Sequence, residues 1–306
     1  MEKSSLKKAM NGIINIYKER GYTSFDVVAR LRGICRQKRI GHTGTLDPDA
    51  TGVLPVCLGN ATSLCDLLTD KTKEYETVLL LGITTDTQDM TGTVLGRKDV
   101  NLNEADVVSC IDQFTGDIEQ IPPMYSAIKI DGRRLYELAR EGRTIERKER
   151  PVTIHSIDIL SMDLPRVTMR ITCSRGTYIR TLCNDIGERL GCGGTMENLV
   201  RIRSGDFRIE NAATLDEVQK WADEGDLSGH IMSVEDVFGD CGSIRMNPPA
   251  DKLLHNGNTF RKTDMADNTD SAKERFRVYD SEGTFYGVYD YDRGRKLYRP
   301  FKMFIP

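Results

Sequence analysis

Short apolar runs separated by polar, glycine-containing segments recur along most of this chain. Runs of that kind, bounded by turn-forming residues, are typical of β-strands. The pattern predicts strands at 12–17, 74–82, 152–160, 166–173, 275–279, 284–291 and 297–304. Because only a short turn separates the 152–160 and 166–173 runs, we expect these two strands to pair.

Helical spacing of apolar residues predicts helices elsewhere. Thr23 or Ser24 can cap a first helix and Asn103 a second, while 135–141 forms a short helix and another ends at Gly191. The expected apolar faces are Phe25, Val28, Leu31 and Cys35; then Val107, Ile111 and Phe114; and finally Ile179, Leu182, Cys183, Ile186 and Leu190.

This mixture of strands and helices lacks repeated strand–helix units, so it predicts an α+β fold with a mainly antiparallel sheet. The pattern changes near residue 240. Residues 209–240 are acidic and read as helix or loop, 246–270 are polar and irregular, and strands follow. We therefore expect one domain at 1–240 and a small β-rich domain at 241–306.

Composition describes a soluble globular protein, with 39% hydrophobic and 29% charged residues. No apolar run reaches the length of a membrane helix, and the charged N-terminus precedes no apolar signal core, so we expect a cytoplasmic protein. The net charge is only −3, yet residues 1–40 carry ten Lys or Arg against three Asp or Glu. Residues 129–150 and 166–208 are also basic, which provides local surfaces for phosphate contact.

Metal chemistry is not expected from this sequence. None of the eight cysteines forms a CxxC pair, their spacing matches no common zinc pattern, and the four histidines include no HExxH motif. Buried or neutral free thiols are the expected state. We therefore predict neither a protein-bound catalytic metal nor another cofactor.

The polar 41–52 segment is the first candidate for chemistry. Its glycines and hydroxyls surround Asp47, and Pro48 biases that aspartate towards extended geometry. Asp47, Asp49 and Thr51 also fit the DxDxT pattern of Mg²⁺-dependent phosphatases that form a phospho-aspartate. Such a nucleophile should end a buried apolar strand, whereas this segment is polar. A plain turn is the third reading.

A second candidate is the 175–180 segment, where a glycine turn leads into a helix. Tyr178 and Arg180 would project from the first turn, and an arginine can keep a carboxylate ionised and oriented. Tyr75 is either a core residue or a platform on which a planar ligand stacks. A positioned Asp, an Arg, two Tyr and basic flanks together suit chemistry on an extruded nucleobase.

These segments resemble one known family. GHTGTLDPDATGVLP at 41–55 resembles the catalytic motif of the TruB family of tRNA pseudouridine synthases. Further segments resemble that family in the same order: TSFDVV at 23–28, KEYE at 73–76, TTDT at 84–87, PPMYSA at 122–127 and RGTYIRTL at 175–182. The resemblance covers about residues 10–205, and the tail around 253–258 resembles a PUA-type RNA-binding domain.

The resemblance implies a pseudouridine synthase fold with a mainly antiparallel mixed sheet and a PUA-like C-terminal domain. It implies isomerisation of uridine 55 in the T-loop of tRNA, without a cofactor, after the base flips out. The partner would be the tRNA T-arm. We expect a monomer, because no association motif is visible. A non-catalytic tRNA-binding or RNA-folding protein remains an alternative to both enzymes.

The resemblance also implies roles for individual residues. Asp47 would be the essential catalytic carboxylate, through attack on C1′, attack on C6, or proton removal at C2′. Arg180 would pair with Asp47, and Tyr75 would stack on the flipped base. The expected substrate contacts are His42 as a wedge in the T-loop, Tyr178 and Leu199 as pocket walls, and Lys18.

Two further features complete the comparison with the family. Residues 121–150 correspond to a basic insertion that clamps RNA. Where the family usually has Asp-Lys-Pro, this chain has Tyr17-Lys18-Glu19, so only Lys18 is retained. Because the proline is missing, the rigidity of that loop is in question more than the chemistry.

Overall fold

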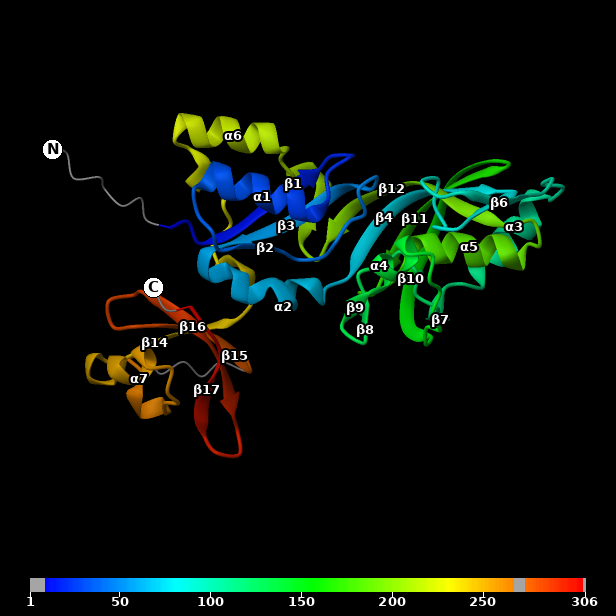
Figure 1. Cartoon of the computed structure of the whole chain (residues 1–306). Coiled ribbons are helices and arrows are strands. Elements are labelled where there is room, and N and C mark those ends of the chain that lie inside the picture. Colours follow the sequence, from blue (N-terminus) through cyan, green and yellow to red (C-terminus); the bar gives the residue numbers. More distant parts are fainter. Residues whose placement is uncertain (1–8, 267–272, 305–306) are drawn as a thin grey trace.

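The computed structural model describes residues 9–266 and 273–304 and consists of two main sheets with helices around them (Figure 1). The larger sheet has nine strands. Its main path is β1 (Gly12–Lys18), β3 (Thr51–Leu58), β12 (Gly194–Ser204), β4 (Lys73–Leu81), β11 (Arg166–Cys173), β10 (Arg150–Asp163) and β7 (Gly116–Gln120). β2 (Ile40–His42) pairs with β3, and β13 (Phe207–Arg208) pairs with β12.

Antiparallel pairing holds between all neighbours in this sheet except β3 and β12, which are parallel. This confirms the predicted α+β class with a mainly antiparallel sheet, and it confirms the expected pairing of the 152–160 and 166–173 strands. The expected polar loop at 41–52 is shorter than predicted, because its two ends belong to β2 and β3.

The central strand β12 has no counterpart among the predicted strands. Its interior carries the buried Thr195 and Arg201, so apolar and polar positions do not alternate as they do in a half-buried strand. Two register shifts against β4 break the period further. Its backbone pairs with β3 and β4 on either side and with β13 at its end, and this pairing defines the strand.

The first helix, α1 (Ser24–Cys35), is capped by Thr23 in a capping box with Asp26. Its buried stripe is Ser24, Val27, Val28, Leu31 and Cys35. Phe25 was expected in this stripe, but 64% of it is exposed. Since successive residues turn by about 100° around a helix, Phe25 lies well away from the middle of the buried stripe.

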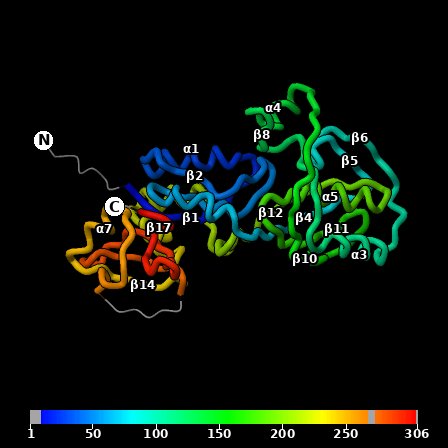
Figure 2. The backbone as a smooth tube through the Cα atoms, turned by 90° about the horizontal axis from the view of Figure 1, so that it is seen from below, coloured from blue at the N-terminus to red at the C-terminus, as the bar shows by residue number. Residues whose placement is uncertain are grey.

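The remaining helices are α2 (Cys65–Thr69), α3 (Glu104–Asp112), α4 (Leu135–Arg140), α5 (Ile179–Arg189), α6 (Leu215–Glu224) and α7 (Asp251–His255). Asn103 is the N-cap of α3, as predicted. Gly191 follows the end of α5 with a positive φ, which confirms the predicted end of that helix. Figure 1 places α1 and α6 at one end of the large sheet and α3 and α5 at the other, and Figure 2 agrees for α1, α3 and α5. Each pair covers its own hydrophobic cluster, so the sheet has two cores along its length.

The predicted C-terminal strands form the smaller sheet, in the order β14 (Gly242–Arg245), β15 (Arg275–Tyr279), β16 (Phe285–Asp292) and β17 (Leu297–Met303). This sheet has a core of its own, but Val288 and Phe304 also pack with Ile13, Val53 and Phe238. The boundary near 240 stays a prediction. The expected irregular 246–270 region contains α7, and its last four residues lie outside the described residues.

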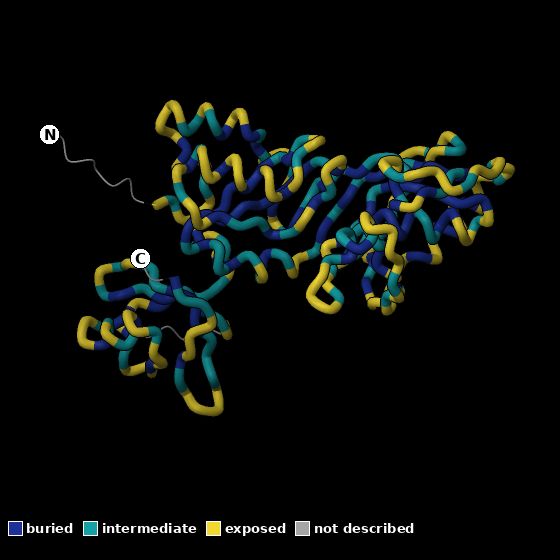
Figure 3. The backbone as a smooth tube through the Cα atoms, in the orientation of Figure 1, coloured by how far each residue is buried: buried dark blue, intermediate teal, exposed yellow. Residues whose placement is uncertain are grey.

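The 121–150 insertion contains β8 (Lys129–Ile130), β9 (Arg133–Arg134) and α4. Figure 2 shows it projecting from the large sheet. Figure 3 shows the buried backbone following the strands and exposed backbone along much of the insertion. Its two buried leucines, Leu135 and Leu138, anchor α4 and leave the basic side chains around them at the surface.

Candidate active site

A pocket of about 260 Å³ brings together five of the seven predicted site residues. Its walls come from the 44–47 loop, the 69–75 segment, the insertion, the 174–180 turn and β12. The five residues are Asp47, Tyr75, Tyr178, Arg180 and Leu199. Segments that are far apart in sequence therefore meet where the sequence motifs predicted chemistry.

The Asp47 carboxylate is ion-paired with Arg180, with 3.2 Å between Oδ2 and Nε. The guanidinium is 94% buried, and its other nitrogens are also used: Nη1 contacts Asp89 Oδ2 at 3.2 Å and the Thr87 carbonyl at 3.0 Å, while Nη2 donates to the Tyr125 carbonyl at 2.9 Å. One cation therefore serves two carboxylates, and two backbone carbonyls fix its orientation.

Burial of Asp47 in the pocket raises the pKa of its carboxyl, the Arg180 cation opposes that shift, and the negative Asp89 adds to it. The side chain still exposes 41% of its surface at the mouth. Burial prevails because Arg180 is shared with a second carboxylate, so its charge is not available to Asp47 alone. The result is a carboxylate that a ligand can reach and whose charge is incompletely neutralised.

Two tyrosines form further walls. Tyr75 lies in β4 opposite Arg201 of β12 and is 8% exposed, and its burial raises the pKa of the phenol. Tyr178 precedes α5, where its backbone N–H donates to Gln120 Oε1 at 3.0 Å and its carbonyl accepts from Gln120 Nε2 at 3.2 Å. Both rings therefore stand on rigid elements.

Lys18 does not line the pocket and has no exposed surface. Its ammonium donates to the carbonyls of Tyr22 at 2.6 Å, Pro48 at 3.0 Å and Glu19 at 3.1 Å, and burial lowers its pKa to about 8. The expected substrate contact is therefore corrected: Lys18 supports the loop beneath Asp47. Although the family's proline is missing, Lys18 and a bond from Gly21 N to the Pro48 carbonyl hold this loop.

His42 also lies outside the pocket lining, at the end of β2. Its Nδ1 accepts a hydrogen bond from the backbone N–H of Gly44, at 3.3 Å, and Gly44 is part of the pocket wall. Burial lowers the pKa of the imidazole, so the ring is neutral at pH 7. A neutral ring beside the mouth can contact a base without placing a charge against it.

Sequence reasoning missed two charged residues of this site. Asp89 closely follows the TTDT segment, but nothing local indicates that it reaches an arginine 91 residues away. Arg201 is 1% exposed, and its guanidinium donates to the carbonyls of Val53 at 2.7 Å, Gly44 at 3.2 Å and Thr45 at 3.5 Å. A cation bound to three carbonyls has no sequence signature, because any residue supplies a carbonyl.

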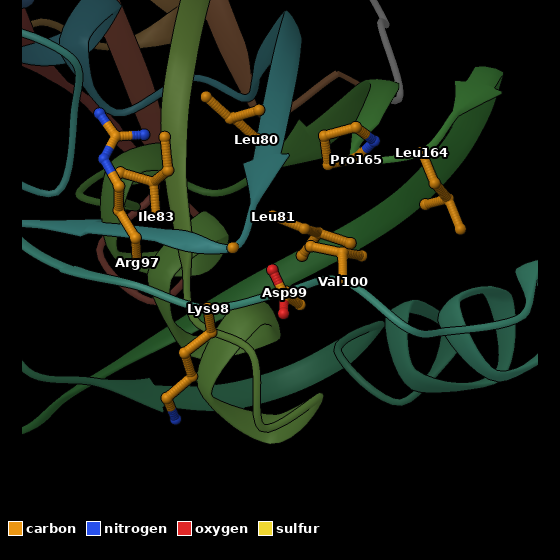
Figure 4. A pocket seen from close by; sticks show the side chains of 10 residues that line it. Leu80, Leu81, Ile83, Arg97, Lys98, Asp99, Val100, Leu164 and Pro165 are labelled. Atoms are coloured by element: carbon orange, nitrogen blue, oxygen red, sulfur yellow. The ribbon is translucent and has the colours of Figure 1, made fainter.

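A larger cavity of about 640 Å³ contains none of the predicted residues (Figure 4). It lies between the end of β4, the 97–100 segment and the Leu164–Pro165 turn. Its walls combine apolar side chains with Arg97, Lys98 and Asp99. Cavity size alone therefore does not locate the chemistry in this molecule.

Two absences within the described ranges, 9–266 and 273–304, concern metals and membranes. In these ranges no three or more His, Cys, Asp or Glu side chains are grouped so that they could hold a metal ion. No helix in these ranges has the length and apolar character needed to cross a bilayer. The cytoplasmic location and the monomeric state stay predictions.

Solved structures define the class of fold. The chain resembles a structure of an H/ACA RNP bound to a substrate RNA containing 2′-deoxyuridine, with a TM-score of 0.70 and 23% identity over 96% of this chain and 85% of that one. It also resembles a Cbf5-Nop10-Gar1 complex, with a TM-score of 0.71 and 25% identity over the same shares. The fold is that of the pseudouridine synthases.

Two family models match consecutive parts of the sequence. The N-terminal domain of TruB family pseudouridylate synthase matches 32–179, and the C-terminal domain of tRNA pseudouridylate synthase B matches 180–238. A curated relative named tRNA pseudouridine synthase B, from Lachnoclostridium phytofermentans, is 52% identical over 97% of this chain and 100% of its own length. Its namesake from Clostridium kluyveri is 44% identical over 91% and 95%. This chain belongs to the TruB family of pseudouridylate synthases.

Proposed function

We propose that this enzyme converts uridine 55 in the T-loop of tRNA to pseudouridine, with Asp47 as the catalytic carboxylate. The observation that carries the proposal is the Asp47–Arg180 ion pair at the mouth of a pocket walled by Tyr75, Tyr178 and Leu199. Relatives named tRNA pseudouridine synthase B span nearly the whole chain, and they supply the substrate class.

The reaction is an isomerisation, so every atom of the uridine is retained. The N1–C1′ bond breaks, the uracil turns in the pocket, and C5 bonds to C1′. The proton on C5 then leaves and N1 gains one, which balances the change. The detached uracil has to stay enclosed between these two events, and the two tyrosines and Leu199 provide walls for that purpose.

Asp47 has to be ionised in each of the three proposed routes, whether it attacks C1′, attacks C6 or removes the C2′ proton. Arg180 favours the ionised form and orients it, while Asp89 holds Arg180 from the other side. We propose that Tyr75 stacks on the uracil. We also propose that Tyr75, whose phenol stays protonated, assists the final removal of the C5 proton by Asp47, because both residues line the same pocket.

RNA binding is assigned to basic surfaces around this pocket. In the insertion, the guanidinium groups of Arg134 and Arg140 lie 5.8 Å and 5.5 Å from the centre of the Tyr136 ring. Such a cluster combines charge for phosphates with an aromatic face for bases. We propose that residues 1–240 form the catalytic domain and that the 241–306 region acts as a PUA-like RNA-binding domain.

The decisive experiment uses unmodified tRNA with EDTA present, followed by mapping of pseudouridine. We expect product at position 55 with the wild-type chain and none with Asp47→Asn, while Asp47→Asn still binds tRNA. Absence of product from the wild-type chain would overturn the proposal. Product from Asp47→Asn at the wild-type rate would remove Asp47 from its catalytic role.

The same samples separate the two alternatives. A phosphatase using the DxDxT segment would release phosphate from small phosphoesters in a Mg²⁺-dependent manner and stop in EDTA. A purely RNA-folding protein would retain all its effects on tRNA in Asp47→Asn and form no pseudouridine. Asp49 is exposed, whereas Asp47 has the arginine partner, and this difference favours the isomerase.

A further inference from the structure

Two aromatic rings stand together outside the pocket, at the start of α1 and the end of β2. The Phe25 and His42 rings are 6.1 Å apart between centroids and meet edge to face, with 78° between their planes. Phe25 is 64% exposed, while the apolar residues of the same helix that follow it are packed on β2 and β3. The pair therefore presents an aromatic surface to solvent beside the core.

Phe25 is fixed relative to the loop that carries Asp47. The preceding residue, Ser24, is buried and accepts a hydrogen bond from Leu46 N at 2.9 Å while donating to the Leu46 carbonyl at 3.4 Å. The capping box of Thr23 and Asp26 closes the same turn. The first turn of α1 is thus bonded directly to the residue before Asp47, which limits its independent movement.

The pair also lies next to the pocket mouth. His42 accepts its hydrogen bond from Gly44, and Gly44 to Asp47 form one wall of the pocket. The exposed Arg20 bonds to Asn198 at 3.3 Å, and the next residue, Gly21, bonds to the Pro48 carbonyl, so a cation for a phosphate lies near the loop that carries Asp47. An aromatic surface, a neutral imidazole and a guanidinium match the bases and backbone of an RNA loop.

We propose that Phe25 is an RNA-contacting residue on which an unpaired base next to the extruded uridine stacks. This rests on the proposed function, since it assumes that an RNA loop occupies the mouth of the pocket. A single exposed apolar residue is ordinary on a protein surface. Phe25 differs because its ring is rigidly placed, adjoins His42 and borders the site. Stacking on an aromatic ring is tolerant of base identity, so Phe25 contributes affinity and placement more than sequence selection.

The test measures binding of an unmodified tRNA transcript in the Asp47→Asn background, which prevents turnover. Phe25→Ala should weaken binding roughly tenfold, the order expected for the loss of one stacked base. Phe25→Trp should bind like the parent, and Phe25→Leu should bind like Phe25→Ala, because it is apolar but has no ring to stack. The slope of affinity against salt should not change, since no charge is removed.

Leu95→Ala is the matched control, because Leu95 is 69% exposed on β6 (Val94–Arg97) at the far end of the large sheet (Figure 1). It should bind tRNA like the parent, and thermal melting should show every variant folded. An affinity of Phe25→Ala for tRNA within twofold of the parent would overturn this inference and leave the proposed function standing. Equal affinities of Phe25→Leu and Phe25→Trp would do the same. Failure of the wild-type chain to bind and modify tRNA would instead overturn the proposed function, and this inference with it.

Discussion

Two buried arginines line the same pocket and are used in opposite ways. Arg180, on α5, is paired with the carboxylates of Asp47 and Asp89. Arg201, on β12, has no carboxylate within 4.0 Å among the residues that the structure describes, and it donates to three backbone carbonyls. The first is paired with carboxylates, whereas the second mainly binds backbone carbonyls, and its charge also opposes the rise in the pKa of the Tyr75 phenol.

This difference teaches how the site divides its tasks. A guanidinium between two carboxylates influences their charge, orientation and pKa. A guanidinium among carbonyls influences the shape of a loop, because those carbonyls would otherwise be buried without donors. Around Asp47, Lys18 acts like Arg201, since it too donates to carbonyls from a buried position. The main charge acting on Asp47 therefore comes from Arg180 on α5, and support for its loop comes from β1 and β12.

The strongest test of this comparison is Arg180→Met. Losing one preorganised electrostatic partner costs roughly 10³-fold in rate at the upper end, so we expect a loss of that order in single-turnover conversion of tRNA. With the cation gone, the pKa of Asp47 rises further, and the acid limb of the pH–rate profile moves to higher pH. Arg180→Lys keeps the charge and should retain more activity. A single-turnover rate of Arg180→Met within tenfold of the wild-type rate would contradict the role assigned to Arg180.

Arg201→Met should mainly affect stability. Three carbonyls lose a buried donor, at about 1 kcal/mol each, so the free energy of unfolding should fall by roughly 3 kcal/mol in denaturant titrations. The acid limb of the pH–rate profile should not shift, because the Asp47–Arg180 pair is intact. An acid limb that moves as in Arg180→Met would show that the two arginines share one task.

Asp89→Asn tests the second carboxylate that is paired with Arg180. The amide keeps the shape but removes a negative charge that raises the pKa of Asp47. We therefore expect the acid limb to move to lower pH, opposite to Arg180→Met. Activity at neutral pH should fall by about tenfold, because Arg180 loses one of the groups that orient it. An unchanged acid limb would mean that Asp89 does not influence Asp47.

The smallest effect is expected at Asp185 on α5. The pKa of its carboxyl is shifted by burial and not by an ion pair. Burial raises its pKa from 3.8 to about 6. A folded-state pKa above the unfolded value means that stability falls as pH rises from about 4 to 6, and the loss persists above that window. Asp185→Asn should therefore raise stability at pH 7 by about 1 kcal/mol after allowance for solvent screening.

This gain should disappear below pH 4, where both states bind the proton. Glu146→Gln, at an exposed carboxyl of the insertion that is not among the charges acting on Asp185, is the control and should leave the pH dependence of melting unchanged. A pH-independent gain in Asp185→Asn would point to a change in packing instead of charge.

Much of the fold follows from local patterns. The capped start of α1, the cap at Asn103 and the strand at 275–279 agree with the structure, because capping and alternation depend on neighbours in sequence. β12 and Phe25 were not predictable in this way. β12 carries buried polar residues that its partner strands explain, and Phe25 is an apolar residue of α1 that lies away from the buried stripe.

The sequence by itself determined the family, the segment containing Asp47, and the residue types that meet in the pocket, since each of these lies within a short motif. The tertiary structure alone decided that Arg180 is shared with Asp89, that Arg201 and Lys18 hold the loop from beneath, and that Phe25 stands beside His42. These arrangements join residues distant in sequence, and their energies come from burial and from charges brought together, which no local pattern of residues specifies.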